Sequence, residues 1–246
     1  MKRFFDLVLG TILLLIASPI LIVFSALIYA QDRHNPFYMP KRVGKGEKDF
    51  TMFKLRSMII NADKTGVDST ANNDNRITRV GALVRKFKLD ELTQLINVVL
   101  GDMSLVGPRP NVSRETVLYT KVEKRLLSVR PGITDLSSIV FSDEGSILDG
   151  SADPDLDYNQ LIRPGKGKLG LFYIDNRSLL LDLRILYLTA VAIVNKRAAL
   201  DGVVAILRSL NAPEELVEIA KREKPLVPSA PPGALNIVTD RNSIPN

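Results

Sequence analysis

Residues 7–30 read LVLGTILLLIASPILIVFSALIYA, and this stretch decides the fold class of the chain. It contains no charged side chain, and Asp6 and Asp32 bound it. As an α-helix it would be about 36 Å long at about 1.5 Å per residue, enough for a bilayer core of about 30 Å. It is too long for the apolar region of a cleaved signal peptide, and it lacks a small-x-small cleavage motif. We therefore predict a membrane helix.

Pro19 lies near the middle of this helix. It cannot donate a backbone hydrogen bond to Leu15, so a kink is expected there. The hydroxyl of Ser18 can satisfy a carbonyl that the kink frees. Because positive charge favours the cytoplasmic side, basic residues at both ends favour a re-entrant helix over the alternative, a simple span. These residues are Lys2 and Arg3 before the stretch, and Arg33, Lys41, Arg42, Lys45 and Lys48 after it.

The composition narrows the class of function. The 246 residues contain no cysteine and one histidine, which excludes disulfides, thiolate metal sites and sites built from several histidines. Lys and Arg outnumber Asp and Glu by 33 to 27, a net charge of +6 that suits nucleic acid or an anionic membrane with phosphorylated substrates. Tryptophan is absent and aromatic residues make up 6%, which disfavours a nucleic-acid-binding membrane protein.

The remaining residues predict an α+β fold that is mainly helical, with a short β element and amphipathic helices at the membrane interface. Gly101 is expected to cap a helix over 82–100. The helix over 179–194 carries Asp182 and Arg184, so it suits the membrane surface or the core better than a second span. Further predictions are a strand within 41–58, a polar loop over 60–80, an amphipathic helix over 111–128, a loop over 142–168, and helices over 200–210 and 213–222.

Several charged residues are candidates for a site, although each has a simpler interpretation. Asp90 and Glu91 lie beside basic residues near the start of a helix, where carboxylates also compensate the helix dipole. Lys54 and Arg56 alternate on one strand face, as a phosphate clamp or as a solvated face. Arg109 lies between two prolines that stiffen it, which suits a bidentate phosphate contact or a structural turn.

The sequence Gly165-Lys166-Gly167-Lys168 looks like a phosphate-binding loop only superficially. It lacks the Gly-x4-Gly-Lys-Ser/Thr spacing that such a loop requires, and we discount it.

The order of the motifs is more specific than any one of them. KRFFD, the apolar run broken by SP, FKLRSM, RITRVG, LVRK, LDELTQLINVVLGDMSLVGPRP and VRPGIT follow one another along the chain. In this order the chain resembles the bacterial sugar transferases, over about residues 1–195 and most specifically over 89–110. The resemblance is to a small form that consists of the catalytic core. The implied organisation is a re-entrant membrane helix over 1–32, a catalytic core over 33–198, C-terminal helices over 199–222 and a disordered tail over 223–246.

The resemblance also implies roles for individual residues. Asp90 corresponds to the nucleophile and Glu91 to its partner, with Mg²⁺ bound by both, and Lys54 completes the catalytic set. Ser18 and Pro19 correspond to the bend of the membrane helix. The implied substrate contacts are Arg56, Arg79, Arg85, Pro108, Arg109, Pro110 and Asp182.

The implied reaction transfers a sugar-1-phosphate from a UDP-sugar to undecaprenyl phosphate through a phospho-aspartyl sugar, releasing UMP. This would be the first membrane step of exopolysaccharide, capsule, O-antigen or glycoprotein glycan synthesis. The implied location is the cytoplasmic face of the bacterial inner membrane, with downstream glycosyltransferases as further partners. The alternative is a non-catalytic membrane scaffold of a glycan-assembly complex, which would have no need of Asp90.

One stretch departs from the family pattern. Many relatives carry a Gly-x-Ala-Gln-Val segment leading to an arginine after the Arg-Pro-Gly-Ile-Thr motif. This chain has DLSSIVFSDE there, with Ser142 near the arginine position. Either another base such as Arg163 takes over, or the donor phosphates are bound differently.

Overall fold

The computed structural model describes residues 1–62 and 74–240. The described chain is mainly helical with short strands, which confirms the predicted class. The longer helices are α1 (Lys2–Asp32), α2 (Arg79–Lys86), α4 (Gln94–Leu100), α9 (Arg163–Asn176), α10 (Leu179–Val194), α11 (Lys196–Ser209) and α12 (Glu214–Lys221). The short ones are η1 (Lys45–Glu47), α3 (Leu89–Leu92), α5 (Ser113–Thr116), η3 (Glu123–Ser128), α6 (Leu136–Val140), α7 (Glu144–Ile147), α8 (Pro154–Asp157) and η4 (Tyr158–Ile162).

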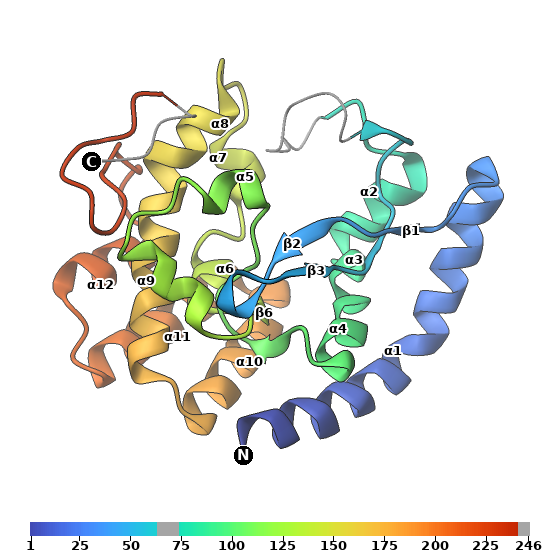
Figure 1. Cartoon of the computed structure of the whole chain (residues 1–246), viewed down its shortest axis with the longest axis horizontal. Helices are drawn as coiled ribbons and strands as arrows, with labels where there is room; N and C mark the ends of the chain where they lie inside the picture. Colours follow the sequence, from blue (N-terminus) through green and yellow to red (C-terminus); the bar gives the residue numbers. More distant parts are fainter. Residues whose placement is uncertain (63–73, 241–246) are drawn as a thin grey trace.

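Helix α1 contains Pro19 without interruption of the helix. The Ser18 hydroxyl donates to the Leu15 carbonyl at 2.8 Å, which is the carbonyl that Pro19 leaves without an N–H partner. Figure 1 shows that α1 changes direction along its length, from the N-terminus to its end beside β1. The Ser18 hydroxyl thus provides a donor for the carbonyl that Pro19 leaves without one.

Both ends of α1 are fastened to the rest of the protein. Near its start, Lys2 pairs with Asp182 of α10 at 2.6 Å, and Asp6 is buried. Asp6 accepts hydrogen bonds from the Ser104 hydroxyl at 2.9 Å and from the Leu105 N–H at 3.2 Å. At its end, Asp32 accepts two hydrogen bonds from Arg56, at 2.5 and 2.7 Å. The helix therefore starts and ends on the same globular body.

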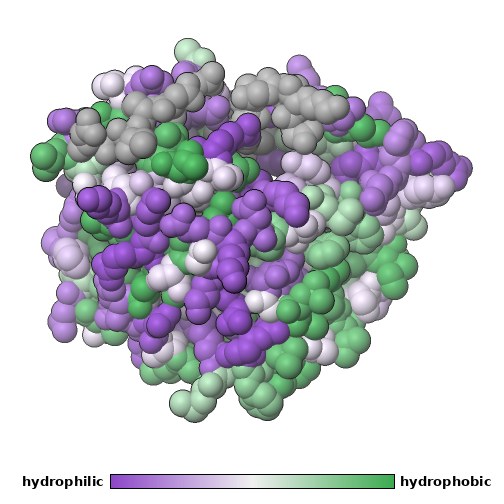
Figure 2. Space-filling model, viewed as in Figure 1, coloured by the Kyte–Doolittle hydropathy of each residue, from purple (hydrophilic) through white to green (hydrophobic). Residues whose placement is uncertain are grey.

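Much of α1 between these ends is uncovered. Among the described residues, it is the one helix long and apolar enough to cross a membrane. Figure 2 shows an apolar surface at the position that α1 occupies in Figure 1. A core helix would be covered on all sides, so this exposure favours membrane association. Its exposed large apolar side chains are Phe4, Leu7, Val8, Ile12, Leu15, Ile16, Ile20, Ile22, Val23, Leu27 and Tyr29.

Three small sheets connect the helices. Strand β1 (Phe37–Tyr38) pairs antiparallel with β4 (Lys54–Leu55), and β2 (Lys41–Val43) pairs antiparallel with β3 (Asp49–Thr51). Strands β5 (Ser104–Val106) and β6 (Gly132–Thr134) are parallel.

Two glycines, Gly107 just after β5 and Gly132 at the start of β6, allow the two backbones to approach closely. A Cβ atom on Gly132 would lie 2.1 Å from the Gly107 nitrogen, and one on Gly107 would lie 2.6 Å from the Arg130 carbonyl oxygen. Only glycine permits such a close approach of two backbones. This contact fixes the path of the segment that follows Gly107.

The main core joins the β5–β6 sheet to the C-terminal helices. Buried apolar residues from α4, α6, α9, α10, α11 and α12 pack together there. The predicted helix over 179–194 is confirmed as α10, with Ser178 capping its start. A smaller cluster packs α1 against α2, α3 and β4.

Some predicted elements differ from the structure. The helix expected over 82–100 is divided into α2, α3 and α4: Lys88, with a left-handed φ of 52°, separates α2 from α3, and Thr93 lies between α3 and α4. Gly101 ends α4 in a left-handed conformation, as predicted. The expected helix over 111–128 consists of the short α5 and η3, whereas the expected loop over 142–168 contains α7, α8, η4 and the start of α9. The loop predicted over 60–80 lies partly outside the described residues.

The tail after α12 packs on the protein as far as it is described. Val238 is buried, and its carbonyl accepts a hydrogen bond from Gln160 at 2.6 Å. The Ser229 N–H donates to the Gln160 carbonyl at 3.0 Å, and Thr120 donates to the Pro232 carbonyl at 2.5 Å. The predicted disordered tail therefore differs from the structure over residues 223–240, because backbone hydrogen bonds and one buried valine replace the solvent contacts expected for a segment rich in proline.

Candidate active site

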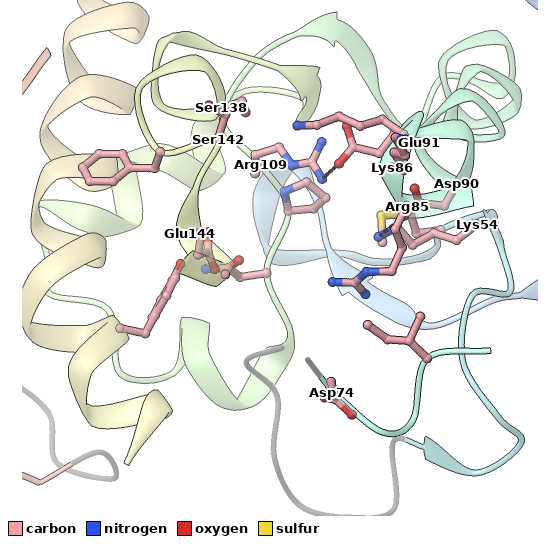
Figure 3. A pocket seen from close by; sticks show the side chains of 18 of the residues that line it. Lys54, Asp74, Arg85, Lys86, Asp90, Glu91, Arg109, Ser138, Ser142 and Glu144 are labelled. Carbon is pink, nitrogen blue, oxygen red and sulfur yellow. Dashed lines mark hydrogen bonds and ion pairs between the residues drawn. The ribbon is translucent and has the colours of Figure 1, made fainter. Parts of the chain in front are cut away.

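A cavity of about 1120 Å³ opens between the α2–α3 region and the α5–α9 region. Figure 3 shows Asp90, Lys54 and Arg85 on one side of it, and Ser142 and Glu144 on the other. Ligand sites commonly have volumes of about 300–1,000 Å³, so this cavity has room for a nucleotide sugar. Of the predicted site residues, the cavity brings together Lys54, Arg79, Arg85, Asp90, Glu91, Arg109 and Pro110.

Asp90 and Glu91 have different partners in this cavity. Asp90 Oδ2 lies 3.3 Å from Lys54 Nζ, and the Asp90 side chain is 14% exposed. Glu91 Oε1 accepts a hydrogen bond from Arg109 Nη2 at 2.9 Å. The two carboxylates are therefore held by separate cations and point in different directions, as neighbouring positions of a helix require.

Thr93, just after α3, and Asn97 of α4 are tied to the residues that precede Lys54. The Thr93 hydroxyl donates to the Phe53 carbonyl at 3.0 Å, and Asn97 Oδ1 accepts from the Phe53 N–H at 2.9 Å. Asn97 Nδ2 also donates to the Thr51 carbonyl at 2.7 Å. Because Phe53 precedes Lys54 directly, these hydrogen bonds fix the distance between Lys54 and Asp90.

Arg109 is positioned by the loop after β5. The Gly132 N–H donates to the Pro108 carbonyl at 2.9 Å, which holds the loop against β6. Arg109 Nη1 donates to the Ile133 carbonyl, while Nη2 reaches Glu91. The guanidinium is thus anchored on both sides, in agreement with the rigid presentation expected of an arginine between two prolines.

Electrostatics keep Glu91 and Arg109 charged. Burial acts to raise the pKa of Glu91, but the charges of Arg109, Lys54 and Lys88 outweigh it and hold this pKa below its usual value. Burial acts to lower the pKa of Arg109, and the charges of Glu91 and Asp135 raise it above its usual value. The pair is an ion pair at neutral pH.

Further cations surround the carboxylates. Arg79 and Arg85 of α2 line the cavity, together with Lys86 and Lys88. Lys88, in its left-handed conformation, separates α2 from α3, and residues of both helices line the cavity. Clustered cations of this kind suit a phosphorylated ligand.

Other predicted site residues do not line the cavity. Arg56 is buried and does not line the cavity, because the Asp32 carboxylate at the end of α1 binds its guanidinium. Pro108 is buried beneath the Arg109 loop. Asp182 is buried and accepts hydrogen bonds from Lys2 and from the Tyr173 hydroxyl, each at 2.6 Å.

Arg163 is not at the cavity either. Its guanidinium forms a buried ion pair with Glu123 at 2.7 Å and donates to the Leu118 carbonyl at 2.8 Å. Ser142 lines the cavity, as does a basic residue of α9, Lys166, which pairs with Glu144. This lysine belongs to the Gly-Lys-Gly-Lys sequence, which lies in α9, where the sequence predicted a loop.

The carboxylates of Asp90 and Glu91 fit a divalent cation that is bound together with a substrate. Within residues 1–62 and 74–240, no group of three or more His, Cys, Asp or Glu side chains is arranged to hold a metal. Mg²⁺ commonly keeps several waters and binds through one or two carboxylates plus substrate phosphates. Two adjacent carboxylates in a cavity that is also lined with cations fit such a site.

The sequence did not single out several residues that shape the cavity. Thr93 and Asn97 are polar residues four positions apart on an apolar helix face, a spacing that marks a common inward side. Glu115, Ser138, Glu144 and Tyr158 come from separate short elements, so no local pattern relates them.

Comparison with known proteins identifies the family. The sequence profile described as bacterial sugar transferase matches residues 1–196. This chain belongs to the bacterial sugar transferase family. The match includes α1 and every residue of the cavity described above.

Curated relatives include proteins of similar and of greater length. The uncharacterized sugar transferase EpsL of Bacillus subtilis is 36% identical over 77% of this chain and 85% of its own length. The undecaprenyl-phosphate galactose phosphotransferase of Salmonella typhimurium is 35% identical over 81% of this chain. The UDP-N-acetylgalactosamine-undecaprenyl-phosphate N-acetylgalactosaminephosphotransferase of Aeromonas hydrophila is 33% identical over 76% of this chain. The chain spans 41% and 42% of the lengths of the latter two.

Proposed function

We propose that this bacterial sugar transferase moves a sugar-1-phosphate from a UDP-sugar to undecaprenyl phosphate and releases UMP. One observation carries the proposal: two ion pairs, Asp90–Lys54 and Glu91–Arg109, lie at a cavity that is lined with further cations. The names of the Salmonella and Aeromonas relatives support the same acceptor. The products suit an early step of exopolysaccharide or related glycan synthesis.

Asp90 is the nucleophile in this proposal. A carboxylate oxygen of Asp90 attacks the phosphorus that bears the sugar, and the bond from that phosphorus to the UMP oxygen breaks. UMP leaves with the electron pair, and the sugar phosphate remains on Asp90 as an acyl phosphate. Asp90 is better placed for attack than Glu91, because Arg109 and its anchor at Ile133 restrain Glu91.

The second step regenerates the enzyme. An oxygen of the lipid phosphate attacks the same phosphorus, and the acyl phosphate bond breaks to release the Asp90 carboxylate. The product is a sugar linked to the lipid through a pyrophosphate. Because UMP leaves before the lipid reacts, this sequence gives ping-pong kinetics.

The cations stabilise the charge of both steps. Lys54 is close enough to Asp90 to approach the phosphoryl oxygens around it, and Arg85 and Arg109 line the same cavity. Preorganised cations are worth more in an enclosed site than in water. A divalent cation, which we propose to be Mg²⁺ held by Asp90 and Glu91, would supply further neutralisation of the pyrophosphate.

We further propose that α1 is re-entrant and that the catalytic core lies on the cytoplasmic face of the inner membrane. A straight span would put the ends of α1 on opposite sides of the bilayer. Here Lys2 and Asp32 both contact the same body, through Asp182 and Arg56. The Ser18–Leu15 hydrogen bond reduces the cost of the proline in an apolar environment.

Cysteine labelling tests this topology, because the chain has no native cysteine. Phe4→Cys and Lys45→Cys place single thiols at exposed positions near the two ends. Neither is expected to react with a membrane-impermeant maleimide in intact cells, and both should react after permeabilisation of the inner membrane. Reaction of one of them from outside would establish a simple span.

The activity is tested with the purified full chain, undecaprenyl phosphate, Mg²⁺ and a panel of UDP-sugars. UMP release that requires the lipid for sustained turnover is the expected result. A folded protein that releases no UMP with any donor would support the scaffold alternative.

A further inference from the structure

The cavity has a second wall that the proposed chemistry does not use. It lies opposite Asp90, as Ser142 and Glu144 show in Figure 3. Its residues come from strand β2, helices α5 and α7, the loop before α7, and the η4–α9 segment. We define this second wall by six lining residues: Arg42, Glu115, Ser142, Glu144, Tyr158 and Lys166.

The second wall carries two cations, Arg42 and Lys166, and two carboxylates, Glu115 and Glu144. Lys166 Nζ forms an ion pair with Glu144 Oε2. Burial raises the pKa of Glu115, and the nearby charge of Arg42 opposes that increase. The wall with Asp90 differs, because its cations outnumber its carboxylates. A pyrophosphate is therefore attracted to the Asp90 wall, and the second wall suits an uncharged part of the donor.

The polar groups of the second wall are held in place. Lys166 Nζ lies 5.2 Å from the centre of the Tyr158 ring and also contacts Glu144. The ammonium is thus fixed by two neighbours from different elements. Carboxylates accept hydrogen bonds, an ammonium donates them, and a hydroxyl such as that of Ser142 does both. Sugar hydroxyls, which also donate and accept, match such a surface.

The proposed reaction requires binding contacts to the sugar that are independent of the nucleotide. After UMP leaves, the sugar phosphate stays on Asp90 until the lipid arrives, and nucleotide contacts no longer position it. The cavity of about 1120 Å³ leaves room beyond the phosphates. We propose that the second wall binds the sugar of the donor, and that the Glu144–Lys166 pair determines which sugar is accepted. This inference rests on the proposed function.

The physical basis is selective hydrogen bonding. A site built to bind a substrate hydroxyl discriminates strongly against a sugar that lacks it or presents it in another direction, because its own polar groups then stay unpaired. Glucose and galactose differ in the direction of one hydroxyl, and their N-acetylamino forms differ from them at one further position. The Glu144–Lys166 pair offers one acceptor and one donor side by side for such a difference.

The test compares donor preference in matched variants of the full chain. Glu144→Gln keeps the size of the side chain and removes its charge. Lys166→Gln is the second variant, in case the first folds poorly. Glu215→Gln is the control, because Glu215 pairs with Lys168 of the same helix α9 outside the cavity. Initial rates of UMP release are measured with UDP-glucose, UDP-galactose, UDP-N-acetylglucosamine and UDP-N-acetylgalactosamine, and UDP serves as a competitive inhibitor without a sugar.

We expect Glu144→Gln and Lys166→Gln to change the ratio of kcat/KM between donors by about tenfold or more, the scale of one lost polar contact. Inhibition by UDP and all ratios of Glu215→Gln should match the wild type. Unchanged ratios in folded, active variants would overturn the inference. Weaker UDP inhibition with unchanged ratios would also overturn it, because the wall would then bind uridine. No UMP release by the wild type from any donor would overturn the proposed function itself, and the inference with it.

Discussion

Two pairs of carboxylates in this protein, Asp90 with Glu91 and Asp6 with Asp182, have opposite surroundings. Asp90 and Glu91 face a large cavity, and their side chains are 14% and 27% exposed. Asp6 and Asp182 are 2% and 1% exposed at the junction of α1, β5 and α10. Each pair is matched with basic or hydrogen-bonding partners, so the presence of partners does not distinguish them.

The difference lies in what remains accessible. Both oxygens of Asp6 are used by Ser104 and Leu105, and those of Asp182 by Lys2 and Tyr173. A substrate cannot reach them without separating α1 from the core. The contacts of Asp90 and Glu91 leave them in the lining of the cavity, where a phosphate can approach. The comparison agrees with the proposal made above, in which Asp90 and Glu91 act on the substrate, whereas Asp6 and Asp182 fasten α1 to the core.

The largest effect is expected for Asp90→Asn. The substitution keeps the shape of the side chain and removes the attacking carboxylate, so UMP release should fall by at least about a thousandfold. The melting temperature in detergent should stay close to that of the wild type, because Asp90 is not in the core. Activity within tenfold of the wild type would remove Asp90 from the chemistry.

Asp182→Asn should affect stability first. It removes the buried carboxylate that pairs with Lys2, whose own side chain is 39% exposed, and breaking a pair with one partly solvated partner costs about 2–4 kcal/mol. The melting temperature should fall by about 5–10 °C. The fraction that remains folded at low temperature should retain activity.

The Lys2–Asp182 pair can be separated from other effects of the substitution. A double-mutant cycle with Lys2→Met and Asp182→Asn measures the coupling between the two side chains. Losses that simply add would contradict the ion pair. An Asp182→Asn protein that is inactive but has normal stability would indicate that Asp182 contacts the substrate, as the family resemblance implies.

Arg109→Lys tests whether Arg109, the partner of Glu91, binds substrate or only supports the loop. Lysine keeps the charge but cannot reach both Glu91 and the Ile133 carbonyl with a planar fork. The KM for the UDP-sugar should rise about tenfold, which corresponds to about 1.4 kcal/mol. The KM for the lipid should change little. Equal changes in both constants, with a lower melting temperature, would indicate a structural turn.

Removal of the tail should have the smallest effect on turnover. Truncation after Lys221 removes the contacts of Val238, Pro232 and Ser229 with the core, so the melting temperature should fall slightly. None of these residues lines the cavity, and kcat should stay within about twofold of the wild type, as is usual for changes remote from a site. A severe loss of kcat in a stable protein would show that the tail shapes the cavity.

Local patterns in the sequence predicted some elements well. Helix α10 follows from a long apolar run, and the end of α4 follows from Gly101. The break at Lys88 within the helix predicted over 82–100 was not predictable, because lysine rarely adopts the left-handed conformation found there. Residues of the cavity were predictable where they share a motif, as Asp90 and Glu91 do.

The positions of the other site residues depend on contacts between segments that are far apart in the sequence. Asp182 is buried because Lys2, 180 positions earlier, pairs with it. Arg56 follows Lys54 by two positions, so the two were predicted to share a strand face. Asp32 at the end of α1 instead binds Arg56 outside the cavity. The second wall is assembled from separate short elements. Such partners cannot be read from spacing along the chain.

The proposed phospho-aspartyl intermediate is tested most directly by trapping it. The wild-type protein is incubated with a UDP-sugar that carries radiolabel in the sugar, with Mg²⁺ and without lipid. Label should stay on the denatured protein, be released by hydroxylamine, be absent from Asp90→Asn and persist in folded Asp182→Asn. Initial-rate lines that converge when both substrates are varied, together with no trapped label on the wild type, would contradict the account, because the sugar phosphate would then pass directly to the lipid.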